Sequence, residues 1–314
     1  MNITARLATL AAALALTAPA HAAATPDQAV QQRTMVVDGM QVFYREAGDP
    51  GKPALVLLHG FPSSSHMFRD LIPKLSGQFH VIAPDYPGSG LSPARPGYTP
   101  TFEELSVVME HFLAQKKLTR YALYVQDFGG PVGFRIAARH PERVSALVIQ
   151  NANAYDVGLS AKIAANIDTL KVGINRDTDV VLERILSPEG VKFMYQHGTR
   201  QPAKLDASTW TLDSAVLQDP AAKAVQKGLL VDYHSNLKQY DAWQAYFRKA
   251  QPPALIIWGK NDPLFTEAGA RAFQQDLPKA ELQLLDTGHF ALEEDGDTIA
   301  DSILAFAARQ GVSR

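Results

Sequence analysis

Short apolar runs alternate with amphipathic stretches over much of the chain. The runs have the length of strands, and the stretches between them repeat apolar positions at helical spacing. The run ALVLL is apolar at every position, which is typical of a strand buried on both faces of a parallel sheet. The pattern therefore predicts a largely parallel sheet covered by helices, with strands at residues 54–58, 79–83, 121–125 and 144–149.

The region before these strands has a different pattern. Two short alternating segments, residues 34–37 and 41–44, flank Asp38-Gly39. An Asp-Gly pair between such segments favours a tight turn, so we expect a hairpin that opens the domain. Residues 23–33 are polar and are predicted to be a linker.

The alternation stops in the middle of the chain. Residues 152–248 contain no apolar run of the buried-strand type, and helical patterns occur at 162–170, 180–186 and 220–240. Strand-like runs return at 253–258 and 281–285, followed by an amphipathic helix at 293–309. We therefore predict one α/β core, residues 34–151 and 249–314, interrupted by a helical cap at 152–248. Such an insertion should lie over the carboxyl ends of the strands, where open α/β sheets bind ligands.

The first 22 residues have the pattern of a secretory signal. Arg6 precedes an apolar run at 7–16, and the segment ends in Ala20-His21-Ala22, an A-x-A cleavage pattern. The run is too short to span a bilayer, and an uncleaved anchor is the alternative. Cleavage after this segment predicts a periplasmic or secreted protein with no membrane attachment.

Composition narrows the chemistry. The 314 residues are 46% hydrophobic, enough for a sizeable core, and 30 basic against 32 acidic residues give no sign of nucleic-acid binding. Cysteine is absent, which excludes disulfides, a thiol nucleophile, cysteine-based zinc sites and iron–sulfur clusters. The nine histidines lack metal-ligand spacing, and no dinucleotide or phosphate-binding loop occurs. We expect no metal and no cofactor, and no heptad pattern indicates an oligomeric state.

Two loops after predicted strands contain glycines that allow close backbone approach. His59-Gly60-Phe61-Pro62 follows the strand at 54–58 and could offer the N–H of Phe61 to a ligand, or be an ordinary turn. Residues 126–130 (QDFGG) have the strand–turn–helix context of a nucleophile elbow, with Asp127 where serine would stand. The alternative is that Asp127 only caps a helix.

Two further residues are candidate partners of Asp127. Asp262 follows the strand at 253–258, and His289 follows the strand at 281–285. With Asp127 they give the chain order nucleophile, acid, histidine of a hydrolase with this architecture. Each alone could be a loop residue, but three such residues in that order, each after a strand, point to a catalytic set.

With these residues the sequence resembles the α/β-hydrolase superfamily, and within it the branch with an aspartate nucleophile, which contains epoxide hydrolases and haloalkane dehalogenases. The resemblance covers residues 34–314 and implies a mostly parallel central sheet flanked by helices, with an inserted helical cap. Residues 85–90 with Ser92 resemble the superfamily's structural D-x-x-G-x-G-x-S turn; Ser89 is flanked by glycines there but lacks the elbow context, so we reject it as a nucleophile. The most specific motifs are HGFP at 59–62, QDFGG at 126–130, GKNDP at 259–263 and GHF at 288–290.

An aspartate nucleophile changes the chemistry. Asp127 is expected to be ionised at neutral pH and held so by the positive end of the following helix. Attack on an acyl carbon would form a reactive anhydride, whereas attack on a saturated carbon gives an ester that water can cleave. The resemblance implies that His289, oriented by Asp262, activates this water, and that the N–H groups of Phe61 and Phe128 stabilise the oxyanion. The expected substrates are water and a small apolar electrophile, an epoxide or an alkyl halide.

The leaving group separates the two families. Dehalogenases usually have a tryptophan after the nucleophile and many have an asparagine after His-Gly; here those positions are Phe128 and Phe61, which counts against halide release. Tyr233 resembles the lid tyrosine of epoxide hydrolases, Tyr195 is a candidate second acid, and His234 a candidate polar contact. We therefore predict opening of epoxides to diols. The rivals are a haloalkane or haloacid dehalogenase and a non-catalytic ligand-binding protein.

Overall fold

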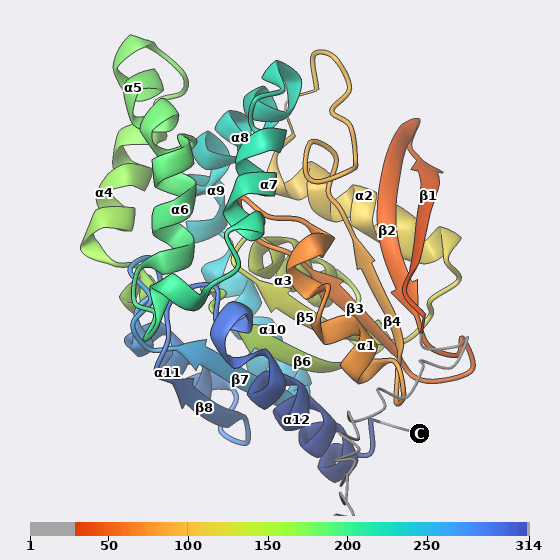
Figure 1. The fold of residues 1–314 in the computed structure, drawn as a ribbon. Coiled ribbons are helices and arrows are strands. Elements are labelled where there is room, and N and C mark those ends of the chain that lie inside the picture. Colours follow the sequence, from red (N-terminus) through yellow and green to blue (C-terminus); the bar gives the residue numbers. More distant parts are fainter. Residues whose placement is uncertain (1–28, 99, 313–314) are drawn as a thin grey trace, which may run out of the picture.

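A single eight-stranded sheet forms the centre of the molecule (Figure 1). The computed structural model describes residues 29–98 and 100–312. In the sheet order β1-β2-β4-β3-β5-β6-β7-β8, only the pairs β1–β2 and β2–β4 are antiparallel. This confirms the predicted mostly parallel sheet. The strands are β1 (Gln31–Val37), β2 (Met40–Ala47), β3 (Ala54–Leu58), β4 (His80–Pro84), β5 (Tyr121–Gln126), β6 (Val144–Gln150), β7 (Ala254–Gly259) and β8 (Glu281–Leu285).

The hairpin at the start is longer than its sequence pattern indicates. Its turn is at Asp38-Gly39, both with positive φ, as an Asp-Gly turn requires. β1 begins at Gln31, inside the segment 23–33 that we predicted to be a linker, because Gln31 and its neighbours pair with β2 although they are polar and exposed. The predicted signal segment, residues 1–22, lies outside the described residues.

Helices cover both faces of the sheet (Figure 1). α1 (Leu71–Leu75) and α12 (Leu292–Gln310) contact each other on one face. The other face is covered by α2, α3, α10 and α11, which contact one another in the order α2–α3–α10–α11. Their bounds are α2 (Phe102–Gln115), α3 (Gly129–Arg139), α10 (Tyr240–Ala250) and α11 (Glu267–Asp276).

Of the helices between β6 and β7, α4 to α9 form the group at the upper left and top of Figure 1. No strand lies between residues 151 and 253 in the described chain. The last of them, α10, crosses the predicted cap boundary at residue 248 and packs against α3 and α11 of the core, where the rings of Trp243 and Phe247 contact Phe134. The preceding helices are α4 (Ala161–Leu170), α5 (Arg176–Ile185), α6 (Pro188–Gln196), α7 (Ser208–Val216), α8 (Pro220–Asp232) and α9 (His234–Leu237).

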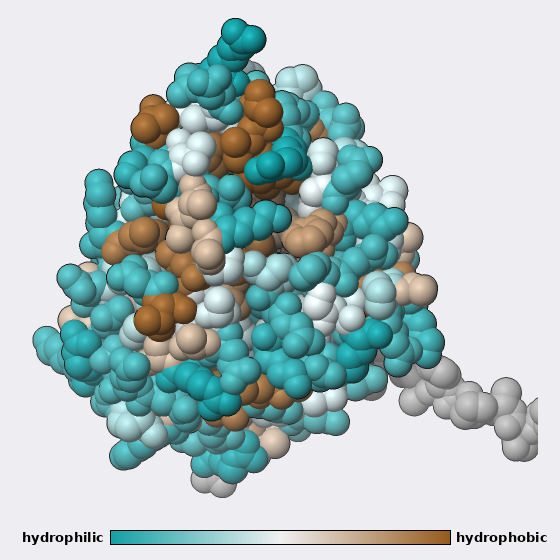
Figure 2. All heavy atoms as spheres, turned by 90° about the vertical axis from the view of Figure 1, so that its left-hand side faces the viewer, coloured by the Kyte–Doolittle hydropathy of each residue, from teal (hydrophilic) through white to brown (hydrophobic). Residues whose placement is uncertain are grey.

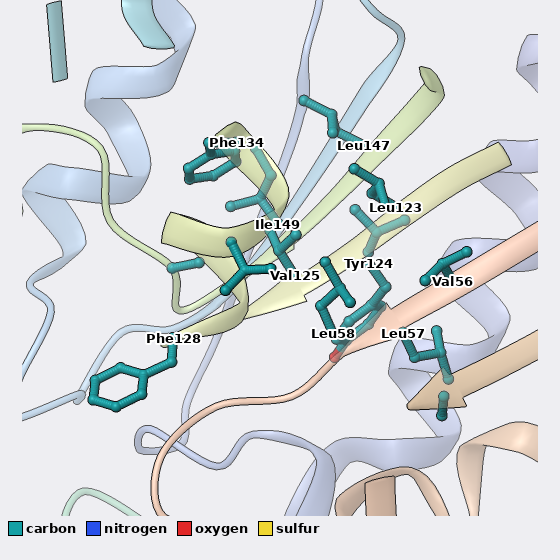
Figure 3. Close-up of a cluster of buried hydrophobic side chains, with 14 of the residues drawn as sticks. Val56, Leu57, Leu58, Leu123, Tyr124, Val125, Phe128, Phe134, Leu147 and Ile149 are labelled. Atoms are coloured by element: carbon teal, nitrogen blue, oxygen red, sulfur yellow. The ribbon is translucent and has the colours of Figure 1, made fainter. Parts of the chain in front are cut away.

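The buried centre of the sheet fixes where the loops emerge. β3 and β5 are buried at every residue, and the aliphatic side chains of β3, β5 and β6 pack together in Figure 3, while the ring of Phe128 points away from them. Parallel pairing sets Gln126 beside Gln150 and Gly259 beside Leu285. The loops after β3, β5, β7 and β8 therefore meet at one edge of the sheet.

In the part of the chain described, no helix is long and apolar enough to cross a bilayer.

Candidate active site

Asp127 occupies a sharp turn between β5 and α3. Its φ is 48°, in the left-handed region that a residue with a side chain seldom adopts. The close packing behind the turn requires the two glycines that follow Phe128: a Cβ on Gly129 would lie 2.1 Å from the carbonyl oxygen of Leu58, and one on Gly130 would lie 2.9 Å from the Cβ of Ala152. This is the strained strand–turn–helix geometry that projects a nucleophile above the sheet edge.

The carboxylate of Asp127 does not cap the helix. Phe128 occupies the N-cap position of α3, and no side chain caps it. Instead, Oδ1 of Asp127 accepts a hydrogen bond of 2.7 Å from the backbone N–H of Phe61. Burial raises the pKa of Asp127, while the charge of His289 and the backbone N–H groups of Phe61 and Phe128 act in the opposite direction. Burial therefore opposes the ionised state that we expected from the helix alone, and the imidazole and the two N–H groups are needed to favour it.

His289 joins the two aspartates in the buried site. Its Nδ1 lies 2.7 Å from Oδ2 of Asp262, and its Nε2 lies 3.7 Å from Oδ2 of Asp127. Burial alone lowers the pKa of His289, but the negative charges of Asp262 and Asp127 outweigh it, so the pKa is raised. The structure thus brings together the three residues selected from the sequence, with the imidazole between the two carboxylates.

Asp262 is held by groups that the sequence did not identify. Its Oδ1 accepts hydrogen bonds from the backbone N–H groups of Leu264 (2.7 Å) and Phe265 (3.1 Å). Its Oδ2 accepts a third, of 2.7 Å, from the side-chain amide of Asn151. Asn151 directly follows β6, and its position after a strand, like that of Asp127, was the signal that could have identified it. Its amide also bonds both backbone groups of Gly259, which joins the ends of β6 and β7.

A cavity of about 310 Å³ opens over Asp127. Its walls come from the core and from α4, α5, α6 and α8, and exposed residues such as Lys162 and Arg184 line it too, so it reaches the surface. Figure 2 shows this side of the molecule, with apolar side chains among polar ones. The lining is mostly apolar: Phe61, Phe128, Ile163, Ile167, Leu170, Ile185, Phe193, Met194, Leu230, Leu264 and Phe265.

Tyr233 is the one phenol that lines this cavity within the described chain. Its side chain is buried, and its ring centroid lies 6.1 Å from that of Phe128. Burial, followed by the neighbouring Tyr240 and Asp127, raises the pKa of Tyr233 well above its ordinary value, so the hydroxyl keeps its proton. A proton donor and a carboxylate therefore face the same apolar space.

The other two cap candidates lie elsewhere. The hydroxyl of Tyr195 donates a 2.5 Å hydrogen bond to Asp213, and its ring stacks on Phe290 at 3.9 Å. Tyr195 is not among the residues that line the cavity, and neither is His234, whose Nδ1 lies 2.9 Å from the carbonyl oxygen of Val231. The structure therefore does not bring Tyr195 or His234 to Asp127, because the helix faces that carry them point to other neighbours.

The glycine-rich turn at 85–90 is held by hydrogen bonds to residues outside the turn. The two carboxylate oxygens of Asp85 accept from the backbone N–H groups of Ser65 (2.7 Å) and Leu91 (2.8 Å). The hydroxyl of Ser89 receives a 3.0 Å hydrogen bond from Gln226 of α8.

No group of three or more potential metal ligands occurs in residues 29–98 and 100–312.

Comparisons with known proteins agree with this architecture. The sequence model of the family described as alpha/beta hydrolase fold matches residues 53–296. An uncharacterized hydrolase of Saccharomyces cerevisiae is 38% identical over 88% of this chain and 96% of its own length. A haloalkane dehalogenase of Bradyrhizobium diazoefficiens is 36% identical over 89% of this chain and 94% of its own.

Solved structures share the fold at low sequence identity. The haloalkane dehalogenase DbeA of Bradyrhizobium elkani has a TM-score of 0.75 at 20% identity, covering 91% of this chain and 100% of its own. The epoxide hydrolase CorEH has a TM-score of 0.73 at 22% identity, covering 90% and 99%. At these identities the likeness shows the fold alone.

Proposed function

The chain belongs to the α/β-hydrolase fold family, and from the geometry of its site we propose that it opens small apolar epoxides to diols through an ester on Asp127. The observation that carries the proposal is the cavity that places Asp127 and the phenol of Tyr233 in one mostly apolar space. A carboxylate and a protonated phenol are the two groups that epoxide opening requires, one to attack carbon and one to protonate oxygen.

The first step uses the oxygen of Asp127 that the backbone does not hold. Oδ1 already accepts from the N–H of Phe61, so Oδ2 is the attacking atom. Oδ2 forms a bond to one ring carbon, that carbon's bond to the epoxide oxygen breaks, and the electron pair goes to the oxygen. Tyr233 gives its proton to this oxygen and becomes a phenolate. His289 takes no proton in this step because the nucleophile is already a carboxylate.

The second step cleaves the ester. His289 removes a proton from water, whose oxygen attacks Cγ of Asp127, and the charge that develops on Oδ1 meets the N–H groups of Phe61 and Phe128. The bond from Cγ to the alkyl-bearing oxygen then breaks, and the histidine returns its proton to that oxygen. The remaining proton of the water restores the phenol of Tyr233, which closes the proton balance.

The side chains around Asp127 favour an epoxide substrate over an alkyl halide. A departing halide needs N–H donors, and the residues next to Asp127 in the cavity, Phe61 and Phe128, have side chains without any donor. A departing alkoxide needs an acid, which Tyr233 supplies. Dehalogenation is the second candidate because a relative named as a haloalkane dehalogenase is 36% identical over most of both chains.

The test measures diol formation and halide release on the purified protein, with an aliphatic epoxide and the matching haloalkane. Tyr233→Phe should lower kcat/KM for the epoxide by about 100-fold. The matched control is Tyr246→Phe: this tyrosine is also buried, its hydroxyl has no partner among the described residues, and it lies outside the cavity. The control should stay within about twofold of the wild type.

Three results would overturn the proposal. Halide release without diol formation would make the protein a dehalogenase. An unchanged rate in Tyr233→Phe would remove the acid from the mechanism. Reversible binding of both compound classes, with no product and no modified Asp127, would identify a non-catalytic binding protein.

A further inference from the structure

Gln126 directly precedes Asp127 and has its side chain buried against the catalytic histidine. Its Nε2 lies 3.1 Å from Nε2 of His289, closer than Oδ2 of Asp127 at 3.7 Å. Its Oε1 is buried and has no hydrogen-bond partner within the described residues. Two groups at hydrogen-bond distance therefore flank the imidazole: Asp262 at Nδ1 and Gln126 at Nε2.

The chemistry of an amide fits both protonation states of the imidazole. With its NH₂ group facing Nε2, Gln126 donates to a neutral ring whose proton sits on Nδ1 and is held by Asp262. This is the tautomer that can take a proton from water. Once Nε2 carries a proton, only an acceptor suits it, and turning the amide over presents Oε1. Gly60 leaves room for the end of the amide that faces away from the ring, because a Cβ there would lie 2.1 Å from Oε1 in its present position.

We propose that Gln126 is a positioning residue that acts through His289, holding its Nε2 in the accepting form before ester cleavage and stabilising the imidazolium during it. The proposal rests on the covalent mechanism above for its kinetic consequence. His289 takes and returns a proton only in the second half-reaction, so at a pH where Asp127 is ionised Gln126 should affect hydrolysis of the ester and not its formation. A purely structural role would slow both half-reactions.

The kinetic experiment separates the two half-reactions by rapid quench and mass spectrometry of Asp127. Gln126→Leu should slow ester hydrolysis by about tenfold, the value of a lost charge-assisted hydrogen bond, with alkylation within about twofold of the wild type. The matched control is Gln150→Leu, at the neighbouring strand end. Gln150 is also buried, and its Nε2 donates to the backbone carbonyl of His289 (3.2 Å) and not to the ring, so any loss of rate should be equal in the two half-reactions.

A second measurement needs no substrate. The ring nitrogens of His289 in the free enzyme are followed by nitrogen-15 NMR as a function of pH. The charged groups that face the ring are Asp262 and Asp127, and Gln126→Glu adds a third carboxylate, which should move the titration to higher pH. Gln126→Leu should change the Nε2 chemical shift, and Gln150→Leu should not.

The outcomes distinguish this proposal from the proposed function. Unchanged ring shifts and an unchanged titration in both Gln126 variants would overturn the positioning role, as would an equal loss in both half-reactions of Gln126→Leu. If the wild type alkylates with no substrate, the proposed function fails, and the NMR titration still decides whether Gln126 controls the state of His289.

Discussion

Replacement of His289 by glutamine should trap the enzyme as its ester. The imidazole is the base placed beside Asp127 to take a proton from the attacking water, since both nearby carboxylates have other roles: Asp127 becomes the ester and Asp262 holds Nδ1 at 2.7 Å. A positioned general base contributes about 10²–10⁴-fold, or about 3–5 kcal/mol of barrier. Hydrolysis should slow by that factor while alkylation continues, so nearly all of the protein should carry substrate at steady state.

The pH dependence of this trapping has a definite sign. In the wild type, burial raises the pKa of Asp127 and the positive charge of His289 opposes that rise. Without the imidazole the pKa of Asp127 should rise further, and only the ionised carboxylate attacks. The rate of ester formation in His289→Gln should therefore increase with pH over a higher range than in the wild type.

Intact-protein mass spectrometry, followed by peptide mapping, is the assay. An epoxide adds to Asp127 without losing an atom, so the adduct should carry the full mass of the substrate, whereas a haloalkane adduct would lack the elements of the hydrogen halide. The double variant Asp127→Ala/His289→Gln should stay unmodified. An unmodified single variant, under conditions where the wild type turns the substrate over, would refute the covalent mechanism.

Three further changes test the site and the fold. Gly60→Ala places a Cβ 2.5 Å from that of Asp127 and should lower kcat/KM by about 100-fold, whereas Gly296→Ala, with nothing within 4 Å, should leave it unchanged. Asn151→Ala removes a 2.7 Å hydrogen bond to the carboxylate of Asp262, which lies 2.7 Å from Nδ1 of His289, and should lower kcat by about tenfold with little effect on KM. Burial by itself raises the pKa of Glu46, but hydrogen bonds from His80 and Lys116 lower it from 4.5 to about 2. Glu46→Gln should therefore cost about 2 kcal/mol of unfolding free energy at pH 7, by urea titration, and the difference from the wild type should shrink as pH falls from 4.5 toward 2.

The sheet was predictable because its central strands are buried on both faces. A run such as ALVLL at β3 has few other stable placements, and the paired parallel strands bring their following loops to one edge. Asp127, Asp262 and His289 could be identified for the same reason: each follows a strand, and their chain order matches the architecture. The start of β1 at Gln31 was missed because an exposed edge strand of polar residues has no apolar pattern to mark it.

The cap residues that face the cavity were harder to predict, because a side chain on a helix can point toward any of several neighbouring elements. Tyr195 and Tyr233 are both buried tyrosines of this region, yet one bonds Asp213 and the other lines the cavity. Sequence spacing does not distinguish these directions when no apolar stripe dominates the helix. Gln126 and Asn151 were missed for a related reason, since their roles depend on distances across strands that only the folded chain defines.

The path of oxygen from water tests the covalent mechanism most directly. A single turnover is run with enzyme in excess over an epoxide, in water enriched in oxygen-18. If Asp127 attacks carbon and water attacks Cγ, the first diol leaves with an oxygen of the aspartate and is unlabelled, and the peptide containing Asp127 gains the label. A labelled first diol with an unlabelled Asp127 would mean that water attacks the epoxide directly, and would contradict the covalent mechanism.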